Sequence, residues 1–155
     1  LVVDGTPCWT SFREFWKMFY DEGAVVVASS YAKVGGVYDF GFRHDPDRPL
    51  ESLAEYCLGC MSNLSLPQRI DMLCKYMDEY QADGLLVNSI KSCNSYSAGQ
   101  LLVLREVERR TGKPAAFIET DLVDPRYFSP ANVKTRLESY FQMIKQKRAV
   151  AAAMA

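Results

Sequence analysis

Apolar residues follow two alternating patterns along this chain. Short and nearly continuous apolar runs occur at residues 1–4, 24–28, 84–87 and 115–118. Such runs predict strands, and an unbroken run is typical of a strand covered on both faces of a parallel sheet. Elsewhere, apolar residues recur every three or four positions, which predicts amphipathic helices at residues 12–20, 50–58, 66–77, 101–111 and 130–148.

The alternation of strands and helices indicates an α/β fold, because a helical crossover joins two parallel strands of one sheet. We predict three layers, with a four-stranded parallel sheet that carries helices on both faces. Residues 1–148 form this domain, and the alanine-rich tail at 149–155 is expected to fray. The chain begins with Leu inside its first predicted strand. We therefore interpret it as the C-terminal α/β domain of a larger subunit whose N-terminal part is missing here.

Local signals refine the predicted helices. Ser11-x-x-Glu14 and Ser65-x-x-Gln68 each match a capping box, in which two side chains satisfy amide groups of the first helical turn. In the helix at 101–111, the spacing predicts that Leu101, Leu104 and Val107 face inward.

Two regions are candidates for contacts with other chains. The helix at 12–20 has an aromatic stripe, and we expect its residues Trp16 and Phe19 to contribute to subunit contacts. The long irregular loop from Ser29 to Pro49 is expected to do the same. It contains the only histidine, His44, for which we favour an exposed position without a chemical role.

The composition excludes some classes of partner. Hydrophobic residues make up 48% of the chain and charged residues 24%, with a net charge of −1. This balance argues against a general electrostatic partner, so we expect neither nucleic acid nor a membrane surface as a partner. No apolar run approaches the roughly 20 residues of a membrane-spanning helix, and the first residues lack the layout of a signal peptide.

Five cysteines occur, an odd number that does not suggest a disulfide framework in a chain without secretory signals. Cys57 and Cys60 form a C-x-x-C motif, but a zinc site needs a second pair, and the sequence has none. Cys57 falls on the apolar positions of its predicted helix, and Cys74 lies in the middle of another. We expect both to be packed as small apolar groups.

The stretch from Asn88 to Ser95 is the strongest candidate for chemistry. It follows the third predicted strand, and ligands of open α/β sheets bind where loops leave the carboxyl ends of strands. The loops that begin at Cys8, Ser29 and Glu119 are expected at the same edge. Small hydrogen-bonding side chains surround Cys93, whereas a core cysteine has apolar neighbours. This setting fits a metal ligand or a nucleophile.

The neighbouring residues narrow that choice only in part. A nucleotide site is unsupported, because no glycine-rich phosphate motif follows these strands. A Cys/His/Asp protease is unsupported, because His44 lies in a remote loop. Two interpretations stay open from the residues alone. One is a soft metal centre, since thiolates from different loops bind iron–sulfur clusters. The other is a polar loop that merely caps the next helix.

Two motifs resemble the 2-hydroxyacyl-CoA dehydratase and benzoyl-CoA reductase family. The first is Asp83-Gly84-x4-Asn88-Ser89-x-Lys91-Ser92-Cys93-x-x-Tyr96-Ser97-x-Gly99-Gln100. The second is Glu119-x-Asp121-x-x-Asp124-Pro125-Arg126-x-Phe128-Ser129. The resemblance covers nearly the whole chain. Asn88 and Lys91 favour the benzoyl-CoA reductase branch, because dehydratase relatives more often have His and Arg at these positions.

The resemblance implies a cluster-bearing subunit of an ATP-dependent benzoyl-CoA reductase, an oxidoreductase of anaerobic aromatic degradation. Such a complex transfers low-potential electrons to an aromatic acyl-CoA thioester and reduces its ring. The implied cofactor is a 4Fe–4S cluster bound by three cysteines, with Cys93 as its one ligand in this chain and two from the missing N-terminal part. The implied partners are a homologous cluster-bearing subunit, ATP-hydrolysing activator subunits, ferredoxin as the electron donor and an acyl-CoA substrate, in the cytoplasm.

We expect the following residues to surround the cluster or to face the substrate: Cys8, Trp9, Asn88, Ser89, Lys91, Ser92, Asn94 and Tyr96. Ser92, Asn94 and Ser95 can donate hydrogen bonds to cluster sulfurs, and Lys91 can offset thiolate charge. Cys8 is expected near the edge without binding iron, and Cys60 is expected to be packed. The fragment alone is not expected to be active.

Two alternative functions accompany this interpretation. The chain can belong to an (R)-2-hydroxyacyl-CoA dehydratase that acts through a ketyl radical. It can also be a non-catalytic interaction module that keeps the fold and binds no metal.

Overall fold

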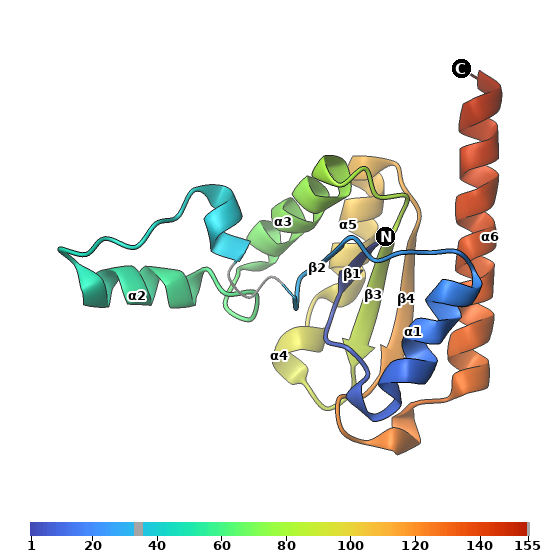
Figure 1. The fold of residues 1–155 in the computed structure, drawn as a ribbon, viewed down its shortest axis with the longest axis horizontal. Coiled ribbons are helices and arrows are strands. Elements are labelled where there is room, and N and C mark those ends of the chain that lie inside the picture. The colour runs from blue at the N-terminus through green and yellow to red at the C-terminus, as the bar shows by residue number, and fades with distance from the viewer. Residues whose placement is uncertain (33–35, 155) are drawn as a thin grey trace.

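Four parallel strands form the sheet at the centre of the computed structural model, which describes residues 1–32 and 36–154 (Figure 1). The sheet order is β2-β1-β3-β4, and every pairing between neighbours is parallel. The strands are β1 (Val2–Asp4), β2 (Ala28–Ser29), β3 (Leu85–Ile90) and β4 (Ala115–Thr120). The predicted four-stranded parallel sheet is confirmed.

Helices cover both faces of this sheet. α1 (Phe12–Asp21) and α6 (Pro130–Met154) pack on one face, and α3 (Leu66–Glu79) and α5 (Gln100–Thr111) pack on the other. The predicted three-layer α/β architecture is therefore confirmed. The remaining elements are η1 (Trp9–Ser11), η2 (Gly36–Phe40), α2 (Pro49–Leu58), α4 (Asn94–Ser97) and η3 (Pro125–Tyr127).

The strands divide their side chains between two apolar clusters. Val3 and Leu86 pack with α1 and α6, whereas Val2 and Leu85 pack with α3 and α5. This division follows from the strand geometry, in which successive side chains point to opposite faces. Both faces are covered, so both sets of side chains are buried, and the apolar runs are continuous for that reason.

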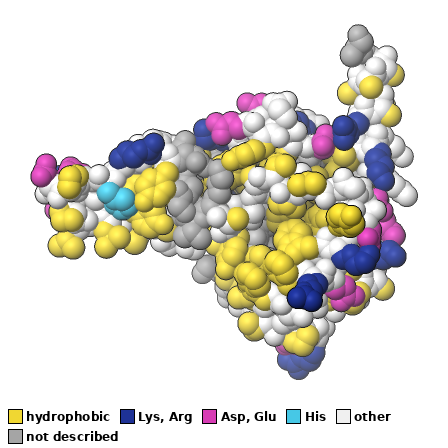
Figure 2. Space-filling view, in the orientation of Figure 1, with side chains coloured by type: hydrophobic (Ala, Val, Ile, Leu, Met, Phe, Trp, Pro, Cys, Tyr) yellow, Lys and Arg dark blue, Asp and Glu magenta, His cyan; other side chains and the backbone are white. Residues whose placement is uncertain are grey.

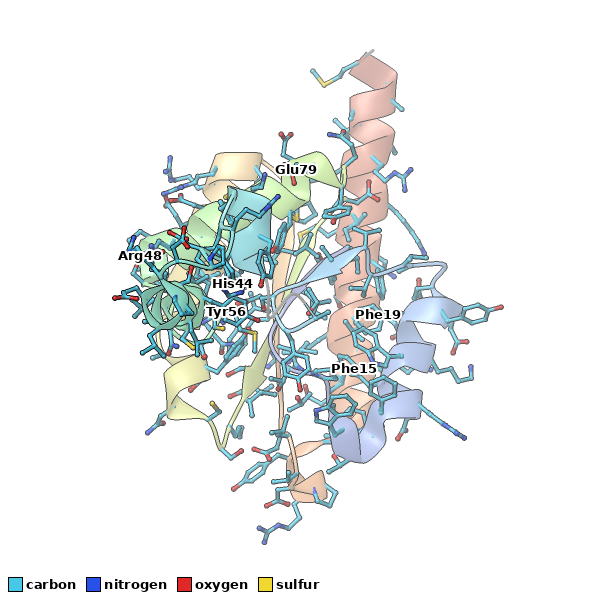
Figure 3. The ribbon with its side chains drawn as sticks, turned by 60° about the vertical axis from the view of Figure 1, so that its left-hand side comes forward. Phe15, Phe19, His44, Arg48, Tyr56 and Glu79 are labelled. Carbon is cyan, nitrogen blue, oxygen red and sulfur yellow. The ribbon has the colours of Figure 1, made fainter. Side chains whose placement is uncertain are left out.

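Aromatic residues of α1 pack in the apolar cluster that α1 shares with α6 (Figure 3). Phe15 and Phe19 are buried, and the ring centroids of Phe19 and Phe141 on α6 lie 5.9 Å apart. Only 2% of Phe19 is exposed, so the expectation that it contributes to a subunit contact is wrong. Trp16 is partly buried against the same cluster.

Helix caps and faces agree with the sequence in part. The capping box at Ser65 and Gln68 is present and confirmed. The one predicted at Ser11 is wrong, because this side chain makes no capping hydrogen bond. In α5, Leu101 is 56% exposed and Val103 is fully buried, so the predicted inward position of Leu101 is also wrong. The buried face of α5 therefore includes Val103 in place of the predicted Leu101.

The strand predicted at 24–28 is reduced to the two residues of β2. Val25 and Val27 lie before it and are 70% and 42% exposed. β2 is an edge strand of the sheet, with β1 as its only neighbour among the described strands. The prediction of a five-residue strand covered on both faces is therefore wrong, because an apolar run does not reveal whether a strand lies at the edge or the centre.

β3 is longer than its apolar run. Asn88 and Ser89, predicted in a loop, are buried in the strand, which ends at Ile90. The assignment of a loop that begins at Asn88 is therefore wrong. These polar residues remain in the strand because β4 continues beside them, pairing Ser89 with Glu119 and Ile90 with Thr120. The loop after β3 begins at Lys91 instead.

Residues 36–62, called the arm below, extend away from the sheet and carry η2 and α2 (Figure 1). The predicted apolar face of α2 is largely exposed, with Leu50 at 77%, Leu53 at 51% and Leu58 at 68% exposure. Cys57 is exposed too, so its predicted packed position is wrong. No layer of the sheet body covers this helix within the described residues. Figure 2 shows hydrophobic side chains on the surface of the arm.

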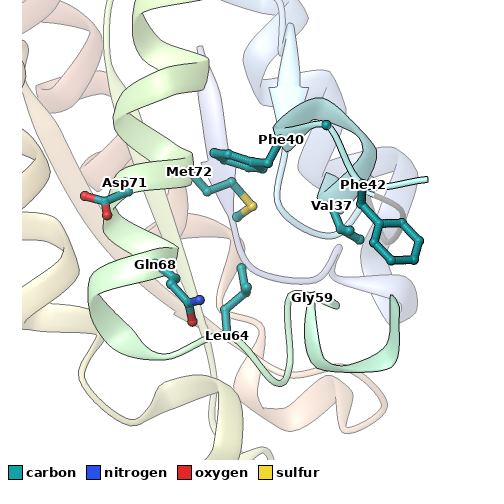
Figure 4. Close-up of a pocket in the computed structure, with 9 residues that line it drawn as sticks. Val37, Phe40, Phe42, Gly59, Leu64, Gln68, Asp71 and Met72 are labelled. Carbon is teal, nitrogen blue, oxygen red and sulfur yellow. The ribbon is translucent and has the colours of Figure 1, made fainter. Parts of the chain in front are cut away.

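The arm has its own small aromatic cluster, visible in Figure 3 around His44 and Tyr56. The His44 Nε2 atom lies 2.8 Å from the Tyr38 hydroxyl, and His44 is exposed. Where the arm meets α3, a cavity of about 520 Å³ lies between Phe40, Leu64 and Met72 (Figure 4). The interface between the arm and α3 is therefore incompletely packed.

α6 is the longest helix among the described residues. All four of its predicted core positions are buried: Val133, Leu137, Phe141 and Ile144. Residues 149–154 continue as helix and are exposed. Among the described residues, no helix combines the length and the apolar character needed to cross a membrane.

Candidate functional site

The strand order creates a switch point between β1 and β3. The chain leaves β1 towards α1 on one face of the sheet and leaves β3 towards α5 on the other. Open α/β sheets bind ligands in the crevice beyond the carboxyl ends of two such strands. The two loops that border this crevice are residues 5–8 after β1 and residues 91–93 after β3.

The loop after β1 lies directly against β3. Gly5 has φ of +127°, and a Cβ atom there would lie 2.2 Å from the carbonyl oxygen of Asn88. Only glycine combines this conformation with such a close approach. The Asn88 side chain fixes the same contact by donating from Nδ2 to the carbonyl oxygen of Thr6 at 2.8 Å. Its Oδ1 accepts from the Thr120 hydroxyl at 2.9 Å, which ties β1, β3 and β4 together.

Cys93 lies at the entry to α4, on the loop after β3. Its amide donates to the carbonyl oxygen of Ile90 at 3.1 Å, and its carbonyl oxygen accepts from the Ser97 amide and hydroxyl. Cys93 is partly exposed. The other cysteine of the crevice, Cys8, is fully buried, with its sulfur 3.7 Å from the Thr10 hydroxyl. Of these two thiols, Cys93 is therefore the accessible one.

Asp121 anchors this loop to the end of β4. Its carboxylate accepts hydrogen bonds from the backbone amides of Val123, Asp124 and Ser92, at 2.9 to 3.0 Å. These bonds, led by that from Val123, lower the pKa of Asp121 to about 2. The carboxylate is therefore ionised near neutral pH and holds the turn before Cys93 in place.

A buried ion pair between Asp4 and Arg69 contacts α4. Arg69 of α3 donates to both carboxylate oxygens of Asp4, at 3.1 and 2.6 Å, and both residues are buried. The hydroxyl groups of Ser30 and Tyr96 complete the cluster, 2.6 Å apart, with Ser30 donating to Asp4 at 2.9 Å. Arg69 also donates to the carbonyl oxygen of Tyr96 and lies over its ring at 4.3 Å. This cluster joins α4 to β1 and α3.

The Tyr96 hydroxyl stays protonated in this cluster. Burial, followed by repulsion from the Asp4 carboxylate, raises the pKa of Tyr96 well above its ordinary value. A protonated phenol can donate, which suits its position beside Ser30 and Asp4. The group is therefore suited to positioning α4 rather than to exchanging protons near neutral pH.

Comparison with known proteins assigns the family. The model of the 2-hydroxyglutaryl-CoA dehydratase D-component family matches residues 1–144. The chain belongs to this family. The resemblance inferred from the two sequence motifs is thereby confirmed.

Several curated proteins are similar to this chain. It is 78% identical to a benzoyl-CoA reductase subunit of Thauera aromatica over 152 residues, which cover 98% of this chain and 35% of that protein. It is 24% identical to the alpha subunit of lactoyl-CoA dehydratase of Anaerotignum propionicum, over 96% of this chain and 34% of that protein. It is 23% identical to the alpha subunit of (R)-2-hydroxyglutaryl-CoA dehydratase of Acidaminococcus fermentans, over 94% of this chain and 29% of that protein. The chain thus spans about a third of the length of these relatives.

The site residues expected from the sequence fall into two groups. Lys91 and Ser92, on the loop that carries Cys93, and Asn94, at the start of α4, are exposed. Trp9, at the start of η1, is 49% exposed. The second group is buried: Cys8 in the loop after β1, Asn88 and Ser89 in β3, and Tyr96 in α4. The first group can meet a ligand directly, and the second supports the loops.

Sequence reasoning missed the buried ion pair below α4. Asp4 directly follows the apolar run of β1, where a charge at the centre of a sheet needs a partner. Arg69 interrupts the apolar stripe of α3, next to Ile70. A charge in a predicted buried position was the available signal in both cases, although it does not identify the partner.

No group of three or more His, Cys, Asp or Glu side chains in residues 1–32 and 36–154 is arranged to hold a metal ion. Cys60 is partly buried with its thiol directed to the Tyr56 carbonyl oxygen, and Cys74 packs against the α3–α5 core as predicted. Among the residues that the structure describes, Cys93 is therefore the one accessible thiol at the crevice.

Proposed function

We propose that this chain is the C-terminal domain of a longer iron–sulfur subunit of a benzoyl-CoA reductase-type complex. The observation that carries this proposal is the 78% identity to the Thauera aromatica benzoyl-CoA reductase subunit across 98% of the chain. The dehydratase relatives are only 22–27% identical, so the overall identity favours the reductase branch. In this proposal, the complex works in the cytoplasm and reduces an aromatic acyl-CoA.

Cys93 is the residue that would bind a 4Fe–4S cluster. Its partial exposure and its place at the β1–β3 crevice fit a thiolate ligand that is shared with another part of the subunit. One thiolate is not enough, so two further cysteines would come from the N-terminal part. When bound, such a cluster supplies one-electron transfer at low potential.

The chain's own residues would position and tune that ligand. Asp121 and the Tyr96 cluster hold the loop and α4 on either side of Cys93. Ser92 and Asn94 are exposed beside it and can donate hydrogen bonds to sulfur, while Lys91 adds a positive charge. A fixed loop of this kind lowers the reorganisation needed when the charge of the site changes.

The exposed apolar face of the arm supports assembly with other chains. Leu50, Leu53 and Leu58 form a stripe on α2 that the body does not cover. We include in the proposal a homologous cluster-bearing subunit, ATP-hydrolysing activator subunits, and ferredoxin as the electron donor. The arm is the part of this chain best suited to such contacts.

Replacement of Cys93 tests the proposal. The full-length subunit is prepared without oxygen as Cys93→Ala and, as a matched control, as Cys57→Ala, which changes an exposed thiol on the arm. Iron content and the EPR signal of the reduced protein are measured for each. We expect loss or degradation of the cluster in Cys93→Ala and parent-like values in Cys57→Ala. Undiminished iron and an unchanged EPR signal in Cys93→Ala would reject the assignment.

A substrate assay separates the reductase from the dehydratase alternative. The assembled complex is supplied with ATP and a low-potential electron donor, and then with benzoyl-CoA or an (R)-2-hydroxyacyl-CoA. Ring reduction of benzoyl-CoA supports the proposal. Dehydration of the hydroxyacyl-CoA without ring reduction would reverse it.

A further inference from the structure

A positively charged pocket lies beside the loop that carries Cys93, on the β4 side. It is a cavity of about 240 Å³ between the end of β4, η3 and the start of α6. Among the described residues, three cationic side chains line it, Lys91, Arg126 and Arg136, together with one carboxylate, Glu119. The hydroxyl of Ser129 and the amide of Asn132 add neutral polar groups. The lining therefore carries more positive than negative charge.

Arg136 is held in place without neutralisation. Its Nε donates to the Asn132 Oδ1 at 3.1 Å, and its Nη1 donates to the Phe117 carbonyl oxygen at 3.3 Å. Both acceptors are uncharged, and among the described residues Arg136 has no ion pair. An oriented guanidinium with spare donors is suited to bidentate binding of a phosphate or a carboxylate.

Lys91 and Arg126 are the other two cations of the pocket. The Lys91 ammonium lies 3.9 Å from Glu119, at the limit of an ion pair, and 5.4 Å from the centre of the Tyr127 ring. Arg126 pairs with Asp124, a residue outside the lining. The charge of Lys91 is therefore weakly compensated, whereas that of Arg126 is largely compensated.

We propose that this pocket binds a phosphate group of the coenzyme A part of the substrate. The inference deepens the proposed function and rests on it. The relatives described above are named for CoA thioesters, and coenzyme A carries phosphates at one end and the thioester at the other. A phosphate subsite beside the Cys93 loop leaves the pantetheine chain free to carry the thioester towards the crevice. Arg136 is the main anion ligand, and Lys91 assists it.

Calorimetric titration of the full-length subunit tests the subsite. The probes are coenzyme A, 3′-dephospho-CoA and pantetheine, and the variants are Arg136→Gln and Arg136→Lys. Arg148→Gln serves as the matched control, because it removes an exposed arginine from the same helix outside this pocket. We expect Arg136→Gln to weaken coenzyme A binding about tenfold, Arg136→Lys to weaken it less, and neither to change pantetheine binding. Arg148→Gln should match the parent.

Two results would overturn the inference. One is a coenzyme A affinity of Arg136→Gln equal to that of the parent. The other result concerns the parent protein alone. The inference fails if the parent does not bind coenzyme A, or binds it no more tightly than it binds pantetheine. Iron content is measured on the same samples. Normal iron with unchanged coenzyme A binding rejects the subsite alone, whereas a parent without iron points to failure of the proposed function.

Discussion

The sheet body and the arm use the same apolar periodicity with opposite results. In the body, the stripe of α3 places Leu73 and Met77 in the core, with no exposed surface. In the arm, the stripe of α2 leaves Leu50 77% exposed and Leu53 51% exposed. The difference lies in what surrounds each helix, since α3 faces a sheet and α2 does not. Periodicity therefore predicts that a helix forms, but not what covers it.

Polar groups are buried in both regions, but among the described residues only the body buries an ion pair. The body buries a complete ion pair, Asp4 with Arg69, and the strand residue Asn88. In α2 of the arm, whose residues 49–58 are all described, Ser52 is the one residue that is buried. The body thus uses buried polar groups to fix the loops of the crevice, whereas the arm keeps apolar surface available. Substitutions in the two regions should separate these roles, and they are given below from the largest expected effect to the smallest.

Breaking the buried ion pair should have the largest effect on the body. Arg69→Met leaves the Asp4 carboxylate buried without its partner, which typically costs about 3–5 kcal/mol of unfolding free energy. Urea unfolding followed by circular dichroism measures the change. The double variant Asp4→Leu/Arg69→Met removes both charges and should recover much of the loss. A change below about 1 kcal/mol in Arg69→Met would show that the pair is not needed for the fold.

A cavity in the core of the body should cost almost as much. Leu73→Ala removes a fully buried side chain between α3 and the sheet, for an expected loss of about 2–5 kcal/mol. The same urea titration measures it. If the loss were as small as that of a surface substitution, the contrast between body and arm would fail.

Gly5→Ala should destabilise the crevice through a single methyl group. The added Cβ would lie 2.2 Å from the Asn88 carbonyl oxygen, and the alanine would have to adopt φ near +127°. We expect a loss of about 2–4 kcal/mol from strain and overpacking. Gly23→Ala is the matched control, because Gly23 also has positive φ but no atom within 4 Å of the new Cβ. If both variants lost the same unfolding free energy, the positive φ alone would explain the loss, and the close approach of the new Cβ to Asn88 would play no part.

Acid should loosen the turn before Cys93 through Asp121. Its pKa is lowered to about 2 in the folded protein, below its ordinary value, so its stabilisation is present above the unfolded pKa of about 3.9. This stabilisation is lost as the pH falls from about 4 to about 2. Asp121→Asn should therefore reduce the loss of unfolding free energy over that interval. A profile of Asp121→Asn parallel to the parent's would contradict this account.

Truncation in the arm should have the smallest effect on folding. Leu53→Ala changes a side chain that is 51% exposed, so the unfolding free energy should change by no more than about 0.5 kcal/mol. The same variant should weaken association with the proposed partner subunit, measured by sedimentation velocity of the mixed subunits. A stability loss near that of Leu73→Ala would mean that the body covers α2 after all.

The sequence predicted the architecture well because its signals are local. The strand runs, the helical periodicity and the capping box at Ser65 each depend on a few neighbouring residues. Errors arose where a distant element decides the outcome. β3 extends through Asn88 and Ser89 because β4 pairs with them, and Val25 is exposed because its strand lies at the edge. Neither neighbour can be read from the segment itself.

The candidate site was predicted in a similar, partial way. Cys93 was predicted as a site residue from its polar neighbours and its place after a strand, and it is partly exposed; its role stays a prediction. Asp4, Arg69 and Ser30 were missed, because their cluster with Tyr96 joins four segments that are far apart in the sequence. The pocket around Arg136 was missed for the same reason. Pairing of distant polar groups is the information that a single sequence lacks.

The central place of β1 has a consequence for how the protein is made. Val2 pairs with Ala28 on one side and with Leu85 on the other, so the second pairing joins residues from opposite halves of the chain. Pairings between such distant segments form slowly, and a ribosome delivers β1 long before β3. The edge of β1 that pairs with β3 therefore has no partner strand until β3 has been synthesised. Because an unpaired apolar strand edge favours aggregation, the nascent chain is most prone to aggregate in the interval before β3 leaves the ribosome.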